Sequence, residues 1–171
     1  FVDGNETDTD KIPMTLNYGE EYTVSVNVGA DMVRGFVNGE QIFQLGGEAP
    51  ANVFAGAAGF GHWSTEAYVD NLKVVSFTDG SVLYENTFDD ASSLDDLKHD
   101  LATYSGGTYT GDPAVFEWED GTLHQTDSSS TGVISYFGDT TWRNYIYTMD
   151  VMPVAGAEGA TILGAINLDA P

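Results

Sequence analysis

Alternation of apolar and polar residues with a period of two constrains this chain more than any other feature. Between residues 22 and 28, small polar residues alternate with the apolar residues Tyr22, Val24, Val26 and Val28. Successive side chains of a β-strand point to opposite faces, so this pattern gives a strand one buried face and one wetter face. Similar runs recur along the chain, and they predict an all-β protein.

Dipeptides that close tight β-hairpins separate several of these runs, namely Asn38-Gly39, Asp79-Gly80 and Asp120-Gly121. Asn, Asp and Gly accept the positive φ angles that a two-residue turn requires. Many short strands with a turn about every ten residues indicate a sandwich of two antiparallel sheets. The predicted strands are 22–28, 32–37, 41–45, 54–60, 67–77, 82–88, 116–118, 122–125, 133–137, 145–151 and 161–168.

Two segments interrupt the strand pattern. Residues 91–101 have leucines on one helical stripe, which predicts a short helix with Ser92 or Ser93 as its N-cap. Residues 62–66 are rich in polar residues and lie between two predicted strands, so we expect them to form a loop.

Charge and composition exclude several classes of function. The 171 residues include 5 Lys and Arg against 27 Asp and Glu, which gives a net charge of −22. Such a chain is repelled by nucleic acids and by anionic membranes, and we expect it to bind neither. With no Cys, it has neither disulfides nor thiolate metal sites. Because the sequence begins at Phe1 rather than Met, we expect a piece of a longer polypeptide.

The order of motifs resembles the concanavalin A-like (laminin G-like) jelly-roll superfamily. "EEYTVSVNVGADMVRGFVNGEQIFQL" followed by "AGAAGFGHWSTEAYVDNLKVVSF" resembles the closing half of that fold. "VLYENTFDDASSLDDL", "FEWEDGTLHQ" and "TTWRNYIYTMDVMPVAGAEGATILGAI" resemble its opening half. The resemblance therefore implies a jelly-roll sandwich with its halves in permuted order, residues 1–77 before residues 82–171.

The hairpin at Asp79-Gly80 explains how such an order can fold. The first and last strands of these sandwiches are commonly antiparallel neighbours, so a short turn can join them and move the chain ends elsewhere. We therefore expect one β-sandwich domain over residues 1–171. The rival interpretation is that the sequence holds the end of one repeat and the start of the next, which complement each other within a chain or between chains.

The sequence does not predict a catalytic residue. Some jelly-roll glycosidases carry acidic residues at alternate positions of one strand, which directs the general acid and the nucleophile to one face. The nearest matches, Glu117 with Glu119 and Glu66 with Asp70, do not complete that Glu-x-Asp-x-Glu pattern. We expect these carboxylates to form solvated strand faces.

Structural calcium is implied by the resemblance. In related carbohydrate-binding sandwiches, calcium lies between an acidic residue of the closing Y-x-D-N strand and oxygen atoms near the first strand. On this sequence those positions are Asp70, with Asp89 or Asp90. The alternative is that Asp70 and Asn71 cap backbone groups at a strand.

Sugar binding is the remaining chemistry that the residue types favour. Sugar rings stack on aromatic side chains, while polar side chains bind the hydroxyl groups. Trp63, with His62 beside it, is the leading aromatic candidate because it falls in the expected polar loop. Tyr104 and Tyr109 lie in a second polar stretch, and Arg34 either binds a hydroxyl or a uronate or neutralises nearby acids.

Together with these features, the resemblance implies a non-catalytic carbohydrate-binding or bracing module of an extracellular glycoside hydrolase, similar to modules of α-L-arabinofuranosidases and xylosidases. Its partners would be a poly- or oligosaccharide and a neighbouring catalytic domain, at an extracellular or cell-surface location. One alternative is a cell-surface spacer or adhesion module that binds protein. Another is a sugar hydrolase in its own right, since a jelly-roll family with similar strand motifs acts on keto-disaccharides.

Overall fold

The fold is described from a computed structural model, which covers residues 12, 14–46, 54–101, 103–104, 107–108, 116–126, 128 and 133–166. Apart from one short 3₁₀ helix, the regular elements of these residues are strands. The elements are β1 (Tyr22–Val28), β2 (Met32–Val37), β3 (Glu40–Gly46), β4 (Ala57–Ser76), β5 (Val82–Asn86), η1 (Ala91–Asp96), β6 (Lys98–Leu101), β7 (Thr103–Tyr104), β8 (Gly107–Thr108), β9 (Phe116–Glu119), β10 (Thr122–Gln125), β11 (Val133–Phe137) and β12 (Tyr145–Ile166).

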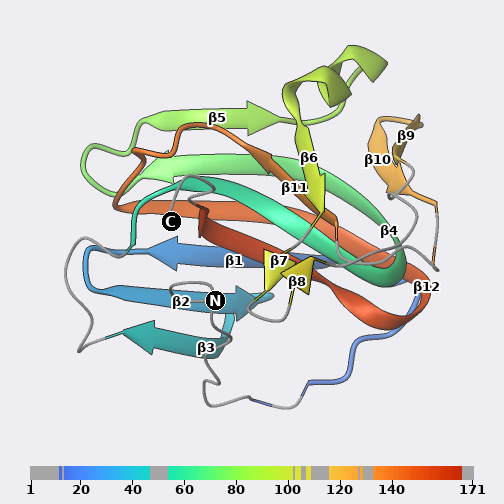
Figure 1. The fold of residues 1–171 in the computed structure, drawn as a ribbon, viewed down its shortest axis with the longest axis horizontal. Helices are drawn as coiled ribbons and strands as arrows, with labels where there is room; N and C mark the ends of the chain where they lie inside the picture. Colours follow the sequence, from blue (N-terminus) through green and yellow to red (C-terminus); the bar gives the residue numbers. More distant parts are fainter. Residues whose placement is uncertain are drawn as a thin grey trace.

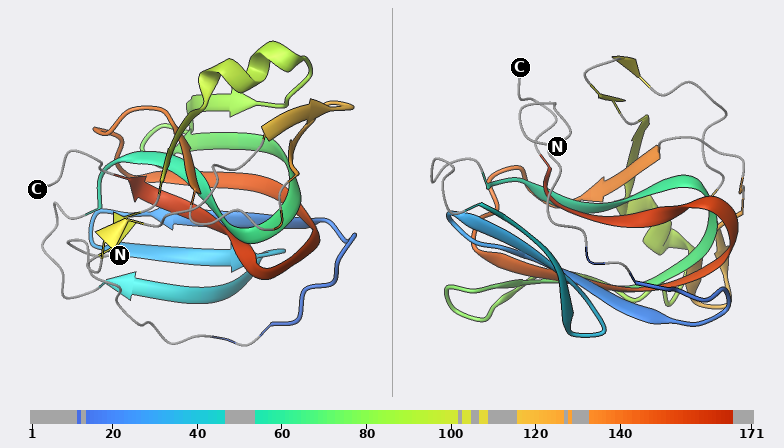
Figure 2. Two further views of the ribbon diagram at one scale, coloured as in Figure 1. Left: turned by 45° about the vertical axis from the view of Figure 1, so that its right-hand side comes forward. Right: turned by 90° about the horizontal axis from the view of Figure 1, so that it is seen from below.

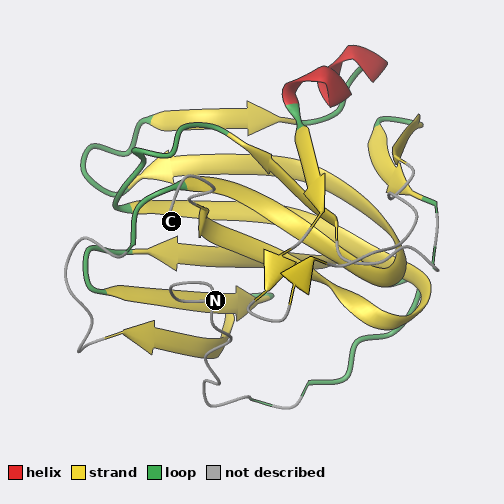
Figure 3. Ribbon diagram, viewed as in Figure 1, coloured by secondary structure: helices red, strands yellow, loops and turns green. Residues whose placement is uncertain are grey.

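Ten of these strands form one large antiparallel sheet (Figures 1 and 3). Its main path runs β3-β2-β1-β12-β4-β10-β9, with β5 and β11 also paired to β4 and β6 paired to β11. The strands β7 and β8 form a separate two-stranded sheet. The all-β prediction is therefore confirmed. No helix among the described residues is long and apolar enough to cross a membrane.

The two long strands β4 and β12 fold the sheet into two layers. They pair along their whole lengths, from Tyr145 opposite Ser76 to Ile166 opposite Ala57. The Tyr145 hydroxyl nevertheless reaches the other end of β4, where it donates to the carbonyl oxygens of Gly56 and Ala57 at 3.2 and 3.1 Å. The two ends of β4 therefore lie across the core from each other, and Figure 2 shows the pair curving over.

The fold-over depends on one close approach between the long strands. Gly156 in β12 has φ +139°, and a Cβ atom there would lie 2.2 Å from the carbonyl oxygen of Ser64 in β4. Ser64 itself has a positive φ of 47°, and the pairing register shifts on both sides of Gly156. Bulges of this kind bend a strand without ending its pairing, so β4 and β12 continue through the bend.

Apolar side chains from both parts of the sequence pack into one core. The alternation predicted for β1 is confirmed, since Tyr22, Val24, Val26 and Val28 are all buried. The far end of β12 covers this strand, because a Cβ atom at Gly164 would meet the side chains of Val26 and Val28. The largest fully buried apolar side chains are Tyr145, Tyr147, Phe60, Phe88, Phe137, Leu72, Leu123 and Met149.

The three predicted hairpins are present. Asn38-Gly39 joins β2 to β3, and Asp120-Gly121 joins β9 to β10. The Asp79-Gly80 turn joins β4 to β5, which pair from Val75 opposite Val82 to Leu72 opposite Asn86. The paired strands β4 and β5 thus join residues 1–77 to residues 82–171.

The loop predicted for residues 62–66 is wrong, whereas the predicted short helix is confirmed with narrower bounds and a different N-cap. Residues 62–66 form part of the continuous strand β4 rather than a loop, because the bulges allow pairing to continue through them. The predicted helix over 91–101 is a 3₁₀ helix of six residues, Ala91–Asp96, followed by strand β6. Its N-cap is Asp90, whose carboxylate accepts from the backbone of Ser92, and neither Ser92 nor Ser93 has that role.

Candidate acidic groove on the outer face of the sheet

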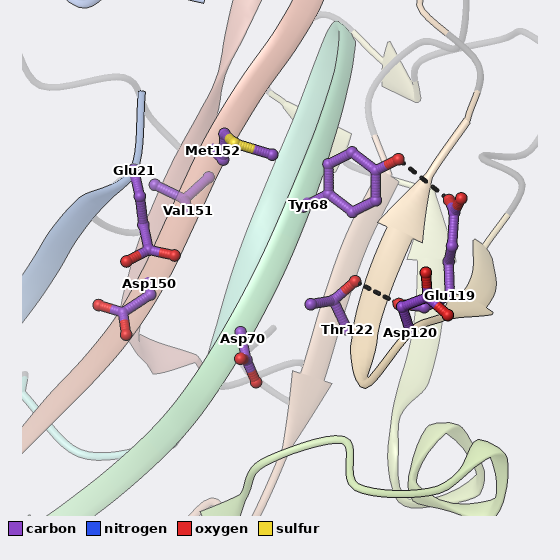
Figure 4. Close-up of a pocket in the computed structure, with 9 residues that line it drawn as sticks. All are labelled: Glu21, Tyr68, Asp70, Glu119, Asp120, Thr122, Asp150, Val151 and Met152. Atoms are coloured by element: carbon purple, nitrogen blue, oxygen red, sulfur yellow. Dashed lines mark hydrogen bonds between the residues drawn. The ribbon is translucent and has the colours of Figure 1, made fainter. Parts of the chain in front are cut away.

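Side chains of β12, β4, β10 and β9, together with Asp120 in the turn between β9 and β10 and Glu21 just before β1, surround an open hollow of about 290 Å³. This volume is at the lower end of the range for pockets that hold small molecules. Figure 4 shows an aromatic ring, Tyr68, between acidic side chains from the flanking strands. The lining residues are Glu21, Tyr68, Asp70, Glu119, Asp120, Thr122, Asp150, Val151 and Met152.

Asp70 and Asp150 form one side of the groove. They lie opposite each other in the pairing of β4 with β12. Asp150 accepts hydrogen bonds from the Thr23 hydroxyl at 2.6 Å and the Asn71 amide group at 2.9 Å. Asp70 accepts from the backbone N–H of Asn71 at 2.7 Å. Burial raises the pKa of Asp70, and the negative charges of Asp150, Glu21 and Asp89 raise it further.

A hydrogen-bonded cluster lies on the other side of the hollow. It contains Glu66, Tyr68, Glu119 and His124, and we call it the histidine cluster. Nδ1 of His124 lies 2.7 Å from Oε2 of Glu119, and Nε2 lies 3.1 Å from Oε1 of Glu66. The Tyr68 ring stacks on the imidazole with the ring centroids 4.0 Å apart.

The Tyr68 hydroxyl donates to the same Oε2 atom of Glu119 at 3.0 Å. This hydrogen bond raises the pKa of Tyr68, and burial and the charges of Glu119, Glu66 and Asp120 raise it further. The phenol therefore stays a hydrogen-bond donor, and its ring is fixed on one side by His124 and at its tip by Glu119.

A second open hollow, of about 310 Å³, adjoins the first and shares Asp150 with it. It lies over β1, β12, β4 and β5, and Lys73 is among its lining residues. The Lys73 ammonium group is paired with Glu85 at 2.7 Å. Asp150 lines both hollows, and we call the two hollows together the groove.

The three residues predicted to bind calcium each make different local contacts. Asp70 lines the groove. Asp89 accepts a hydrogen bond from the Thr87 hydroxyl at 2.8 Å. Asp90 caps η1, and its hydrogen bonds from Ser92 lower its pKa. Among the described side chains, no group of three or more His, Asp and Glu is arranged to hold a metal ion. Calcium binding at Asp70 stays a prediction.

Among the described side chains predicted to contact sugar, His62, Trp63 and Arg34 do not line either hollow. His62 is fully buried, and its ring packs edge-on against Phe60 and Phe116. Trp63 is half-buried in β4, and its indole lies over Gly61.

The other predicted sugar contacts are also outside the groove or outside the described side chains. Nε of Arg34 on β2 donates to the Gln44 side chain on β3 at 3.1 Å. Tyr104 belongs to β7, but its side chain lies outside the described part of the structure, as does all of Tyr109.

Sequence reasoning found Asp70 but missed its neighbours in the groove. Glu66, Tyr68 and Asp70 alternate along one strand, so their shared face was visible in the sequence. Asp150 and His124 come from other strands, and only the sheet order brings them beside β4. A comparison of the sequence with protein-family models finds no match, and a search of the curated proteins finds none either.

Proposed function

We propose that this chain is a non-catalytic carbohydrate-binding module that accompanies an extracellular glycoside hydrolase. The observation that carries the proposal is the groove, in which the Tyr68 ring is held between hydrogen-bond acceptors. Sugar rings offer apolar faces to aromatic side chains and hydroxyl donors to carboxylates. The antiparallel two-layer fold supports the resemblance to concanavalin A-like jelly rolls, and the family assignment and the arabinofuranosidase-like setting belong to this proposal.

The shape of the groove favours an extended ligand. Two adjoining hollows share Asp150, and each has room for a small polar ring. Thr23 and Asn71 fix the Asp150 carboxylate at their junction through hydrogen bonds. A chain of at least two sugar units would occupy both hollows, and Asp150 would accept hydroxyl groups near the linkage.

Charge selects the class of sugar. Every charged side chain that lines the first hollow is acidic, and these are Glu21, Asp70, Glu119, Asp120 and Asp150. Lys73 in the second hollow is held by Glu85. Because like charges oppose binding, the proposed ligand is a neutral glycan, such as a xylan backbone, an arabinan or a β-glucan, and uronate-bearing glycans are disfavoured.

One observation favours hydrolysis as a second candidate function. Asp70, whose pKa is raised, lies opposite Asp150 on the same face. Glycosidases commonly pair a carboxyl group of raised pKa with a second carboxylate. Release of reducing ends from the same glycans, lost on Asp70→Asn, would favour this candidate over a pure binding role.

A pull-down with insoluble xylan, arabinan and β-glucan tests the proposal. We expect retention on at least one of them, reduced about tenfold or more in Tyr68→Ala because the stacking surface is lost. Phe77→Ala is the matched control, since Phe77 is an exposed aromatic residue that does not line the groove. Retention on none of the glycans would favour the spacer or adhesion module instead.

A further inference from the structure

The histidine cluster contains more acceptors than a neutral imidazole can satisfy. Both ring nitrogens of His124 face carboxylate oxygens, at 2.7 Å for Glu119 and 3.1 Å for Glu66. An ionised carboxylate can only accept, and a neutral imidazole has one N–H donor and one acceptor nitrogen. A neutral imidazole beside two ionised carboxylates has one proton to share between the two contacts. Both contacts can therefore be hydrogen bonds only if the three side chains bind one additional proton.

The surroundings of His124 are acidic on both sides. The imidazole is only 12% exposed, and acidic or phenolic groups face it from both neighbouring strands. Glu66 and Tyr68 approach from β4, Glu117 and Glu119 from β9, and Asp120 from the turn beside them.

We propose that Glu66, His124 and Glu119 share this additional proton, and that the proton holds Tyr68 in its position in the groove. Tyr68 has two restraints, the imidazole face and Oε2 of Glu119, and both belong to the proton-sharing group. His124 is therefore a positioning residue. Its link to ligand binding rests on the proposed function, whereas the shared proton rests on the cluster alone.

Loss of the proton has a defined structural consequence. One ring nitrogen would then turn a lone pair toward a carboxylate oxygen, and such a contact is repulsive. Glu119 has the shorter contact and also holds the Tyr68 hydroxyl, so the remaining ring proton stays on Nδ1. Glu66 would separate from Nε2, and the β9–β10 hairpin would lose one of its side-chain links to β4. His124 and Glu119, which restrain Tyr68, both lie on this hairpin, so their position relative to β4 would become less fixed.

Nitrogen NMR of the histidine rings tests the shared proton in the intact chain. The His124 signals are assigned by their loss in His124→Gln. At about pH 6, where histidines commonly titrate, we expect protons on both His124 nitrogens. Glu66→Gln and Glu119→Gln should each weaken binding of the second proton about tenfold, because each removes one of its two carboxylate partners.

Glu117→Gln is the matched control for charge. Glu117 lies opposite His124 in the pairing of β9 with β10, so its loss removes an equal charge but neither of the two contacts. Its effect should be about twofold or less, as for a screened surface charge. A single neutral His124 tautomer in the wild-type chain at about pH 6, or equal effects of all three variants, would overturn the proposal.

Gel retention by soluble xylan or β-glucan, measured across the same pH range, tests the positioning role. We expect retention to fall about tenfold over the interval in which NMR shows the proton leaving, with a shift of the Tyr68 ring signals. Unchanged Tyr68 signals or unchanged retention across that interval would overturn the positioning role. If NMR finds the shared proton but no glycan is retained at any pH, the proposed function fails and the shared proton stands.

Discussion

The two faces of strands β4 and β10 are built from neighbouring residues, yet they are held by different forces. Val69 and Leu123 point inward, are fully buried and lie opposite each other in register. Tyr68 and His124, one position away on each strand, point outward and are joined by ring stacking and shared carboxylates. Removal of apolar surface from water stabilises the inner face, whereas the outer face depends on hydrogen bonds and on charges that water screens.

This difference predicts unequal tolerance to substitution. A change on the inner face leaves a cavity in a packed core, and the cost appears in folding. A change on the outer face leaves the core intact, and the cost appears in binding or in pH dependence. The following variants test this division, beginning with the largest expected effect.

Leu123→Ala should lower the free energy of unfolding by about 2–5 kcal/mol, because Leu123 is fully buried between β4 and β9. Thr122→Ala on the outer face should cost less than about 1 kcal/mol, since it loses only an exposed hydrogen bond to the Glu119 backbone. Urea unfolding of both variants gives the comparison. Equal losses would show that the two faces are not energetically distinct.

Gly156→Ala tests the bend that places one layer of the sheet over the other. A Cβ atom would meet the Ser64 carbonyl oxygen at 2.2 Å in a backbone with φ +139°, so we expect a loss of about 2–3 kcal/mol. Gly121→Ala is the control, with φ +86° but open space around it, and it should cost about 1 kcal/mol. If urea unfolding shows no greater loss for Gly156→Ala, the close approach does not limit the fold.

The inner face was largely predictable from sequence, and the bend was not. Alternation identified β1, and turn dipeptides identified three hairpins, because both signals are local. The segment around His62 and Ser64 resembles a loop because the bulges there interrupt the alternation but not the pairing. For the same reason β12 appeared as two strands, at 145–151 and 161–168, when one strand spans Tyr145–Ile166.

The outer face was harder to predict because its site is assembled from four strands and one turn. Asp70 was identified, but Asp150, which lies opposite it, and His124, which stacks on Tyr68, are 80 and 54 positions further along the sequence than Asp70. Their proximity depends on the sheet order β12-β4-β10, which alternation within a single strand does not determine. Trp63 was favoured as an exposed aromatic residue, although Tyr68 is the aromatic residue that lines the groove.

Calcium binding is the next test, and it addresses the acidic side of the groove. If Asp70 is a ligand, calcium at about tenfold above its Kd should stabilise the fold by about 1.4 kcal/mol, because it binds only the folded chain. Thermal unfolding and titration calorimetry measure this effect. Asp70→Asn should abolish it, whereas Asp79→Asn on the β4–β5 turn should not. No binding heat and no thermal shift would exclude calcium at Asp70.

The smallest expected effect is the pH dependence that Asp70 contributes in the absence of calcium. Its pKa is raised in the folded chain, so the folded state binds this proton more tightly than the unfolded state does. The charged carboxylate therefore costs stability at neutral pH, and that cost disappears as the pH falls through the raised pKa and below the unfolded value. Asp70→Asn should stabilise the neutral protein by less than about 1 kcal/mol, since solvent screens a partly exposed group.

Asp90 should contribute a pH dependence of stability with the opposite sign, so Asp90→Asn is the variant to compare with Asp70→Asn. Hydrogen bonds from Ser92 lower its pKa, so its carboxylate stabilises the fold above the unfolded pKa and loses that contribution as the pH falls. Asn keeps a capping oxygen, so the comparison isolates the charge. Urea unfolding of both variants is measured from neutral to acidic pH. As the pH falls, the free energy of unfolding should approach the wild-type value from above for Asp70→Asn and from below for Asp90→Asn. If both differences have the same sign at neutral pH, burial of Asp70 and the carboxylates around it do not govern its proton affinity.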